Sequence, residues 1–193
     1  LQVRTHTMEN PIPEAQISPL AKVFEEVPAQ SVFVTPNGET VVDFGQNLAG
    51  TIRVKIQEEI GTEVKFEHGE MLDGQGNFFY VFAGTSRAQE DIYICGEKRE
   101  EIFEPHFTYH GFRYIELRGY PGTPSIDSVQ ARVVHSSVER IGSFSCGNEL
   151  INKIHSNYVW TQVSNLHSVP TDCCQRDERM GRRCTDVSRS SSL

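Results

Sequence analysis

The sequence predicts a mainly β protein, a β-sandwich followed by one long helix. Short stretches in which apolar and polar residues alternate recur between about residues 31 and 134, and this alternation is typical of half-buried strands. Clusters of Gly, Pro, Asn and Asp separate them, and short strands with frequent turns favour a sandwich. Apolar residues take the helical spacing only after about residue 145.

The first 30 residues contain four prolines and no sustained periodicity. We therefore expect residues 1–30 to be a connector or the tail of a preceding domain. The chain begins with Leu1 rather than Met and has no apolar signal core, so it reads as a sequence entered midway.

Residues 31–137 carry the strand patterns of the predicted β-sandwich domain. Strands are expected at residues 31–34, 40–44, 51–57, 64–68, 91–95, 112–117 and 129–134, with turns at 36–38 and 73–77 and a break at 45–50. Five bulky residues in a row, 78–82, predict a further strand that is buried on both faces.

A helix is expected from about residue 148 to residue 166. Ser145 or Asn148 can cap its start, and the helix should end before Pro170. Residues 138–144 are then the domain junction, and 138–193 form a second unit. The last six residues are of low complexity and are not expected to pack.

Residues 169–181 concentrate charge in a short segment after this helix. Asp172, Asp177 and Glu178 stand beside Arg176 and Arg179. Such surroundings can hold one carboxyl ionised and another protonated, as a carboxyl general acid requires. A salt-bridged surface loop explains the same residues, because structural ion pairs also perturb pKa values. The residue types alone leave both interpretations open.

Four segments of the chain resemble the bacterial α-L-rhamnosidases, inverting glycoside hydrolases that release terminal rhamnose. They are VDFGQNLAG at 42–50, GEMLD at 69–73, HGFRY at 110–114, and PTDC with QRDERMG at 170–173 and 175–181, in the family's order. The resemblance implies a concanavalin-like or jelly-roll β-sandwich, followed by the first helix of an incomplete (α/α)6 barrel on which the β domain packs.

The resemblance also implies roles for three residues. Glu178 matches the general acid that protonates the departing glycosidic oxygen, and Asp172 and Arg176 match positions that bind rhamnose hydroxyls. The substrate of the parent protein would be a rhamnose-containing glycoside. The general base is a Glu much later in the family's barrel, so we expect it to be absent here and the 193 residues alone to be inactive.

The chain departs from the family pattern at two places. The family usually has Pro where Cys174 stands, and Trp-x-Gly-Asp where this chain has the run from Arg182 to Asp186. Asp186 comes one position late, so we do not carry the family's role onto it. A reading-frame shift or an early end in the source gene would account for the tail.

Composition narrows the classes of partner. The net charge of −8 argues against nucleic acid and anionic membranes, and no apolar run reaches transmembrane length. Five cysteines without regular spacing favour reduced thiols, and with them a reducing, cytoplasmic compartment. No cofactor is expected. No metal is expected either, because Glu70, Asp73 and Asn77 lack EF-hand spacing and the histidines show no ligand spacing.

A second class of function stays open beside the hydrolase fragment. A stand-alone carbohydrate-binding or structural β-sandwich could use Phe79, Tyr80, Tyr109 or Tyr120 as stacking surfaces. An exposed aromatic strip on one sheet face would favour such a module. Aromatics buried in the core, with an apolar patch where the helix docks, would favour the hydrolase fragment. His110 and Arg113 could contact sugar or the catalytic domain, or form ordinary polar pairs at a strand start.

Overall fold

The computed structural model describes residues 12, 14–79, 89–96, 100–120 and 122–171. The described elements are, in order, β1 (Ala21–Pro28), β2 (Ser31–Val34), β3 (Thr40–Ile56), β4 (Glu63–Gly69), β5 (Met71–Leu72), β6 (Phe78–Phe79), β7 (Glu90–Ile94), β8 (Glu101–Phe103), β9 (His110–Arg118), the 3-10 turn η1 (Ile126–Ser128), β10 (Val129–Ser136), α1 (Glu149–Ser164), β11 (Leu166–His167) and β12 (Val169–Pro170). The predicted mainly β fold with a following helix is confirmed.

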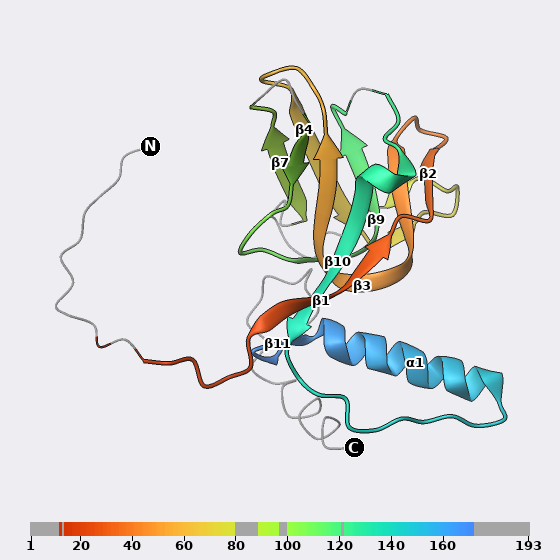
Figure 1. Cartoon of the computed structure of the whole chain (residues 1–193). Helices are drawn as coiled ribbons and strands as arrows, with labels where there is room; N and C mark the ends of the chain where they lie inside the picture. Colours follow the sequence, from red (N-terminus) through yellow and green to blue (C-terminus); the bar gives the residue numbers. More distant parts are fainter. Residues whose placement is uncertain (1–11, 13, 80–88, 97–99, 121, 172–193) are drawn as a thin grey trace.

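Eight strands form one antiparallel sheet that curls into a half-barrel (Figure 1). Its main order is β1-β10-β3-β9-β4-β7, and β2 and β8 also pair with β3. The sheet curls because β3 is long and changes partners along its length, from β2 and β9 at its start to β10 and β8 at its end. The layers expected of a sandwich are thus parts of one sheet that face each other across the core.

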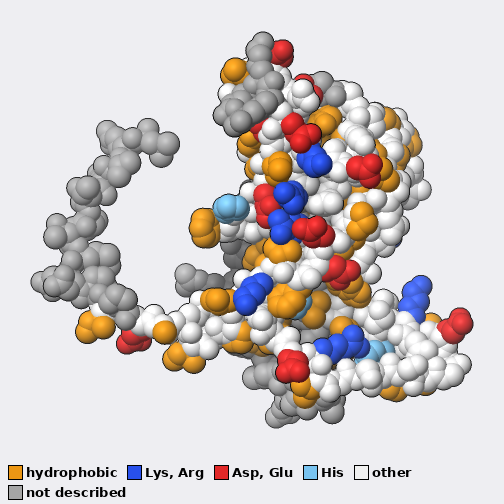
Figure 2. Space-filling model, viewed as in Figure 1, with side chains coloured by type: hydrophobic (Ala, Val, Ile, Leu, Met, Phe, Trp, Pro, Cys, Tyr) orange, Lys and Arg blue, Asp and Glu red, His pale blue; other side chains and the backbone are white. Residues whose placement is uncertain are grey.

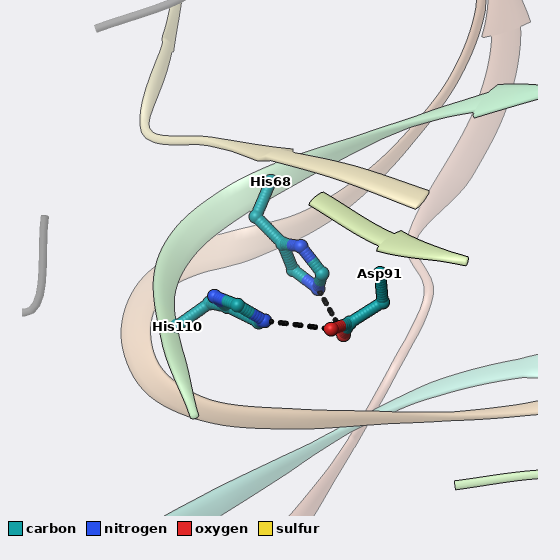
Figure 3. A group of neighbouring side chains, drawn as sticks. All are labelled: His68, Asp91 and His110. Carbon is teal, nitrogen blue, oxygen red and sulfur yellow. Dashed lines mark hydrogen bonds and ion pairs between the residues drawn. The ribbon is translucent and has the colours of Figure 1, made fainter. Parts of the chain in front are cut away.

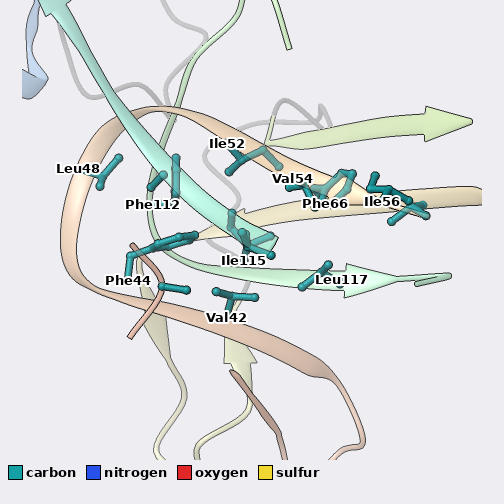
Figure 4. Close-up of a cluster of buried hydrophobic side chains, with 14 of the residues drawn as sticks. Val42, Phe44, Leu48, Ile52, Val54, Ile56, Phe66, Phe112, Ile115 and Leu117 are labelled. Atoms are coloured by element: carbon teal, nitrogen blue, oxygen red, sulfur yellow. The ribbon is translucent and has the colours of Figure 1, made fainter. Parts of the chain in front are cut away.

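The core lies on the inner side of the curl (Figure 4). Its largest fully buried side chains include Phe44, Leu48 and Ile52 of β3, Phe66 of β4 and Phe112 of β9. Inward-facing apolar residues alternate with outward-facing ones along these strands, as the strand period requires. Burial of this apolar surface is the main favourable contribution to folding of the β domain.

Three expectations about elements need correction. Residues 21–28, which showed no strand pattern, form β1 and pair with β10. The break expected at residues 45–50 is an irregularity between Asp43 and Leu48 inside one continuous β3. In the run expected to be buried on both faces, Phe78 is buried but Phe79 is 44% exposed; residues 80–82 of that run lie outside the described residues.

The surface of the β domain carries charges of both signs, and helix α1 packs against one end of the domain. On the face shown in Figure 2, basic and acidic side chains are interspersed over the β domain. Helix α1 lies across one end of the curled sheet and contacts β3 and β10 (Figure 1). Among the described residues, no helix has both the length and the apolar content that a membrane crossing needs.

Candidate functional site

The three residues expected to act on a sugar, Asp172, Arg176 and Glu178, lie outside the described residues. The described chain reaches Thr171, directly before Asp172. The structure therefore describes the segment that leads into the predicted site, namely α1 and the β11–β12 hairpin.

The start of α1 is fixed by two asparagines. The side chain of Asn148 accepts a hydrogen bond from the backbone N–H of Leu150 at 3.0 Å, as an N-cap does. The Asn152 side chain accepts from the N–H of Cys146 at 2.9 Å and donates to its carbonyl at 2.8 Å. Helix α1 therefore begins at a defined point after the extended linker.

Helix α1 presents apolar side chains in two directions. Trp160 packs against the core of the β domain. Four other apolar residues of the helix are exposed: Leu150, Ile151, Ile154 and Tyr158. Their spacing places them along one side of the helix, so α1 keeps an apolar face that the described residues do not cover.

The β11–β12 hairpin ties the end of α1 to the β domain. Nε2 of His167 donates to the carbonyl of Val134 at 3.0 Å, and its ring stacks on Tyr109 at 3.9 Å between centroids. Burial lowers the pKa of His167, which favours the neutral ring. Ser168 at the tip, with φ of 67°, donates its N–H to the hydroxyl of Ser136. The chain is thus anchored to β10 four residues before Asp172.

A hollow of about 390 Å³ lies between α1 and the β3 bend. It is lined by Gln46, Asn47, Leu48, Glu70, Gly111, Asn157, Trp160, Thr161, Ser164 and Asn165. The carbonyl of Asn165 accepts from the N–H of Thr171 at 2.8 Å, which places the hollow next to the start of the predicted site. Its amide and hydroxyl groups can hydrogen-bond a neutral hydroxylated ligand.

Asp43 and Arg113 form a bidentate ion pair at the β3 bend. Nε and Nη2 of Arg113 donate to the two Asp43 oxygens at 2.9 Å each, and the N–H of Gly45 donates to Oδ1 at 2.6 Å. Burial alone would raise the pKa of Asp43, but the hydrogen bonds from Arg113 and Gly45 outweigh it, and the pKa lies below 3.8. Asp43 therefore stabilises the turn at Gly45 and also pairs with Arg113. This pair matches the interpretation of Arg113 as a member of an ordinary polar pair.

A buried polar cluster joins three neighbouring strands (Figure 3). Nε2 of His110 lies 3.1 Å from Oδ1 of Asp91, and Nε2 of His68 lies 3.9 Å from Oδ2 of the same residue. The two imidazole rings stack with centroids 4.1 Å apart. Burial, reinforced by His110, lowers the pKa of His68 to about 3. Of these three residues, sequence reasoning singled out only His110, as a possible member of a polar pair. It missed His68 and Asp91 because they lie on other strands; the remaining signal was polar residues at the ends of strand patterns.

Comparison with known proteins identifies the family. The model of the bacterial α-L-rhamnosidase concanavalin-like domain matches residues 34–135, and that of the bacterial α-L-rhamnosidase 6 hairpin glycosidase domain matches residues 139–185. The first match alone covers more than half of the chain. The chain belongs to the bacterial α-L-rhamnosidase family.

Relatives within the α-L-rhamnosidase family agree with this assignment. An α-L-rhamnosidase of Streptomyces avermitilis is 40% identical over 176 residues, which cover 90% of this chain and 17% of the relative. The solved structure of an α-L-rhamnosidase from Dictyoglumus thermophilum is 44% identical with a TM-score of 0.80, covering 86% of this chain and 19% of that one. The Streptomyces avermitilis enzyme complexed with L-rhamnose is 41% identical, also with a TM-score of 0.80, over 86% of this chain and 16% of that one. The chain thus spans less than a fifth of these rhamnosidases.

Within this rhamnosidase segment, the described aromatic side chains divide between the core and the surface. Phe44, Phe66 and Phe112 are fully buried, and Tyr120 packs against the core. Tyr109 stacks on His167, and Tyr80 lies outside the described residues. Phe79, the fourth stacking candidate, is 44% exposed. The buried core aromatics and the docking of Trp160 of α1 on the same core meet the criterion for a hydrolase fragment.

The other candidate residues of this rhamnosidase segment have structural partners. Asp73 accepts from the backbone N–H groups of Gln75 and Asn77 at 2.8 Å and from the Asn77 side chain at 3.1 Å, which is turn chemistry. Asn47 donates to Glu70 at 3.0 Å. Cys95 and Cys146 are free thiols, and the other three cysteines lie outside the described residues.

Proposed function

We propose that this chain is the part of an α-L-rhamnosidase that joins the β domain to the start of the catalytic domain. The β domain comprises residues 31–137 together with strand β1 (Ala21–Pro28), which pairs with β10. Residues 138–193 are the N-terminal fragment of the six-hairpin domain, and the residues before β1 are a connector or the tail of a preceding domain. The observation that carries the proposal is the match of the two family models to consecutive ranges, 34–135 and 139–185.

The parent protein hydrolyses terminal α-L-rhamnose from glycosides with inversion of the anomeric carbon. Glu178 protonates the departing glycosidic oxygen, and Asp172 and Arg176 bind rhamnose hydroxyls. A second carboxylate, borne by a later part of the parent, activates water on the opposite face of the sugar, roughly 6.5–9.5 Å from the first. The 41% identical Streptomyces avermitilis enzyme, crystallised with L-rhamnose, supports rhamnose as the bound sugar.

The β domain braces the active-site segment. The contacts of His167 and Ser168 with β10 fix the chain four residues before Asp172, and the polar hollow opens beside Thr171. An enzyme needs such anchoring because a displacement of about 1 Å in a catalytic group can cost roughly 100-fold in rate. The 193 residues alone lack the carboxylate that activates water, so they do not hydrolyse the rhamnoside.

The test uses the isolated chain and a chimera in which residues 31–181 replace the matching segment of the Streptomyces avermitilis enzyme. The isolated chain should hydrolyse an aryl rhamnoside at background rate, and the chimera should be active. In the chimera, Glu178→Gln should lower kcat for an alkyl rhamnoside by roughly 10²- to 10⁴-fold. The loss should be smaller for a dinitrophenyl rhamnoside, whose leaving group needs little protonation.

The control is Glu139→Gln, which changes an exposed carboxylate in the linker and should leave both rates unchanged. If the isolated chain hydrolysed the substrate and Glu178→Gln abolished this activity, the result would contradict the proposal that the second catalytic carboxylate lies in a later part of the parent protein. An equal loss on both substrates in the chimera would contradict the role of Glu178 as proton donor.

A further inference from the structure

Three adjacent strands each bring a polar residue to the inner side of the sheet at the same end of the core. The three residues are His68 on β4, Asp91 on β7 and His110 on β9. Each is two positions from an aromatic residue of the core or its edge, namely Phe66, Tyr93 and Phe112, and side chains two positions apart point to the same face of a sheet. His68 and His110 are buried, and the Asp91 side chain is 13% exposed. Polar groups at such positions are costly unless they are paired.

The hydrogen bonds of His68 determine which of its nitrogens is free to bind. Nδ1 lies 2.8 Å from the backbone carbonyl of Gln89, and because a carbonyl only accepts, Nδ1 must carry the hydrogen. In the neutral ring Nε2 then has a lone pair, and it faces Oδ2 of Asp91 at 3.9 Å. Both atoms are buried, and neither has a hydrogen-bond partner among the described residues.

Two acceptors that face each other without a donor repel, and a cation between them removes the repulsion. The third side chain is within reach, because one ligand atom from each of the three residues lies within 4.8 Å of the others. Two imidazole nitrogens and one carboxylate oxygen suit divalent transition metals such as Zn²⁺, and do not suit Ca²⁺ or Mg²⁺, which prefer oxygen. A ring N–H donated to a backbone carbonyl is also the contact that metal-bound histidines usually make.

We propose that His68, Asp91 and His110 form a binding site for a divalent transition-metal ion of the Zn²⁺ class. His68 binds through Nε2, Asp91 through its carboxylate and His110 through Nε2. His110 now donates its Nε2 hydrogen to Asp91; on metal binding this proton moves to Nδ1, which has no other hydrogen-bond partner among the described residues. The ion would link β4, β7 and β9 and so act as a structural centre, independent of the proposed hydrolysis.

The direct test needs no variant. The 193-residue chain is stripped with a chelator, its accessible thiols are methylated, and it is reloaded with Zn²⁺. We expect one Zn²⁺ per chain by elemental analysis, a higher Tm in the loaded protein, and an X-ray absorption spectrum with nitrogen and oxygen neighbours at about 2.0–2.1 Å. No retained Zn²⁺, or sulfur neighbours at about 2.3 Å, would overturn the proposal.

Variants assign the ligands. Asp91→Asn and His110→Gln keep similar shapes, and each should weaken Zn²⁺ binding in calorimetry by more than the roughly 10- to 100-fold that loss of an outer-shell partner costs. The matched control is His106→Gln, because His106 is exposed and forms no such cluster within the described part of the chain. This variant should bind Zn²⁺ like the unmodified chain. Circular dichroism confirms that each variant keeps its strands. Wild-type affinity in a folded Asp91→Asn or His110→Gln variant would exclude this site.

Discussion

At the scale of single residues, Asp43 connects the bend of β3 to the neighbouring strand. Its carboxylate accepts hydrogen bonds from the Gly45 N–H inside the bend and from Nε and Nη2 of Arg113 on β9. These hydrogen bonds require the charged carboxylate, because an ionised group accepts such bonds more strongly than a neutral one. One side chain therefore stabilises both the local bend and the pairing of β3 with β9.

The ion pair predicts a pH-dependent stability. The pKa of Asp43 is lower in the folded chain than its ordinary value of 3.8, so its stabilising contribution is present above that pH and is lost as the pH falls through the folded pKa. Asp43→Asn should lower the free energy of unfolding by about 1 kcal/mol at pH 7, a figure discounted because Arg113 is partly exposed. Urea unfolding measures it, and the difference from wild type should shrink below pH 3.8.

Glu63→Gln is the control for this measurement. The Glu63 side chain, which pairs with Lys65, is 50% exposed against 17% for Asp43, and exposed pairs contribute little. A difference between wild type and Asp43→Asn that is the same at pH 7 and at pH 3 would contradict the charge-based explanation.

The polar residues show what sequence reasoning can and cannot predict about a site. The contact of Asp43 with the Gly45 N–H spans only two residues, so it is the kind of contact that local turn chemistry can predict. The pairing of Asp43 with Arg113, and the meeting of His68 with His110, depend on strand register across large sequence separations. Such contacts leave no periodic trace in the chain, so only the folded sheet reveals them.

At the scale of elements, β3 organises the sheet, and Gly50 is the residue on which its pairing depends. It lies opposite His110 on one side and Val133 on the other. A Cβ atom at this position would come within 1.9 Å of the carbonyl oxygen of Arg132. Because that neighbour is backbone, a larger residue can be accommodated only if β3 and β10 move apart.

We expect Gly50→Ala to lower the free energy of unfolding by about 3 kcal/mol, as overpacking does at a rigid site. Thermal unfolding followed by circular dichroism measures it. Gly142→Ala is the matched control, because a Cβ there meets nothing within 4 Å, and its Tm should not change. Equal Tm values for the two variants would show that β3 and β10 can move apart at Gly50 without loss of stability.

The strands that the sequence predicted best are those with one buried face. Alternation in residues 51–57 matches the end of β3, and Asn148 marks the start of α1 as expected. Strand β1 gave no such signal because it lies at the sheet edge and seven of its eight residues are exposed. The Gly-rich bend looked like a break because local residues do not show that both halves of β3 pair with β9.

At the scale of the whole molecule, the exposed face of α1 agrees with the small share of the family's length that this chain covers. Leu150, Ile154 and Tyr158 are each at least 47% exposed, although a helix in a packed domain normally buries its apolar stripe. The relatives extend well beyond the matched segment. Under the proposed function, the rest of the six-hairpin domain would cover this face.

If the exposed face of α1 is covered in the longer protein, Ile154→Glu should affect the stability of the isolated chain and of the chimera differently. Ile154→Glu should change the free energy of unfolding of the isolated chain by no more than about 0.5 kcal/mol, because the side chain is already exposed. In the chimera it should cost about 1.5–3 kcal/mol, the value of burying such a side chain. Chemical denaturation of both proteins measures the contrast.

Lys153→Glu, at an exposed neighbouring position of α1, controls for the added charge and should have a small effect in both proteins. If Ile154→Glu destabilised the isolated chain as much as the chimera, the rest of the six-hairpin domain would not be what covers this face.

The pairing of β1 with β10 has a mechanical consequence. Ala21, the first residue of β1, lies directly opposite Ser136, the last residue of β10. A pulling force applied to the chain at these two points would load their hydrogen bonds one after another, like a zipper, rather than all at once in shear. Tension between the flanking segments would therefore peel away the edge strand first, while the inner strands of the curl stayed intact.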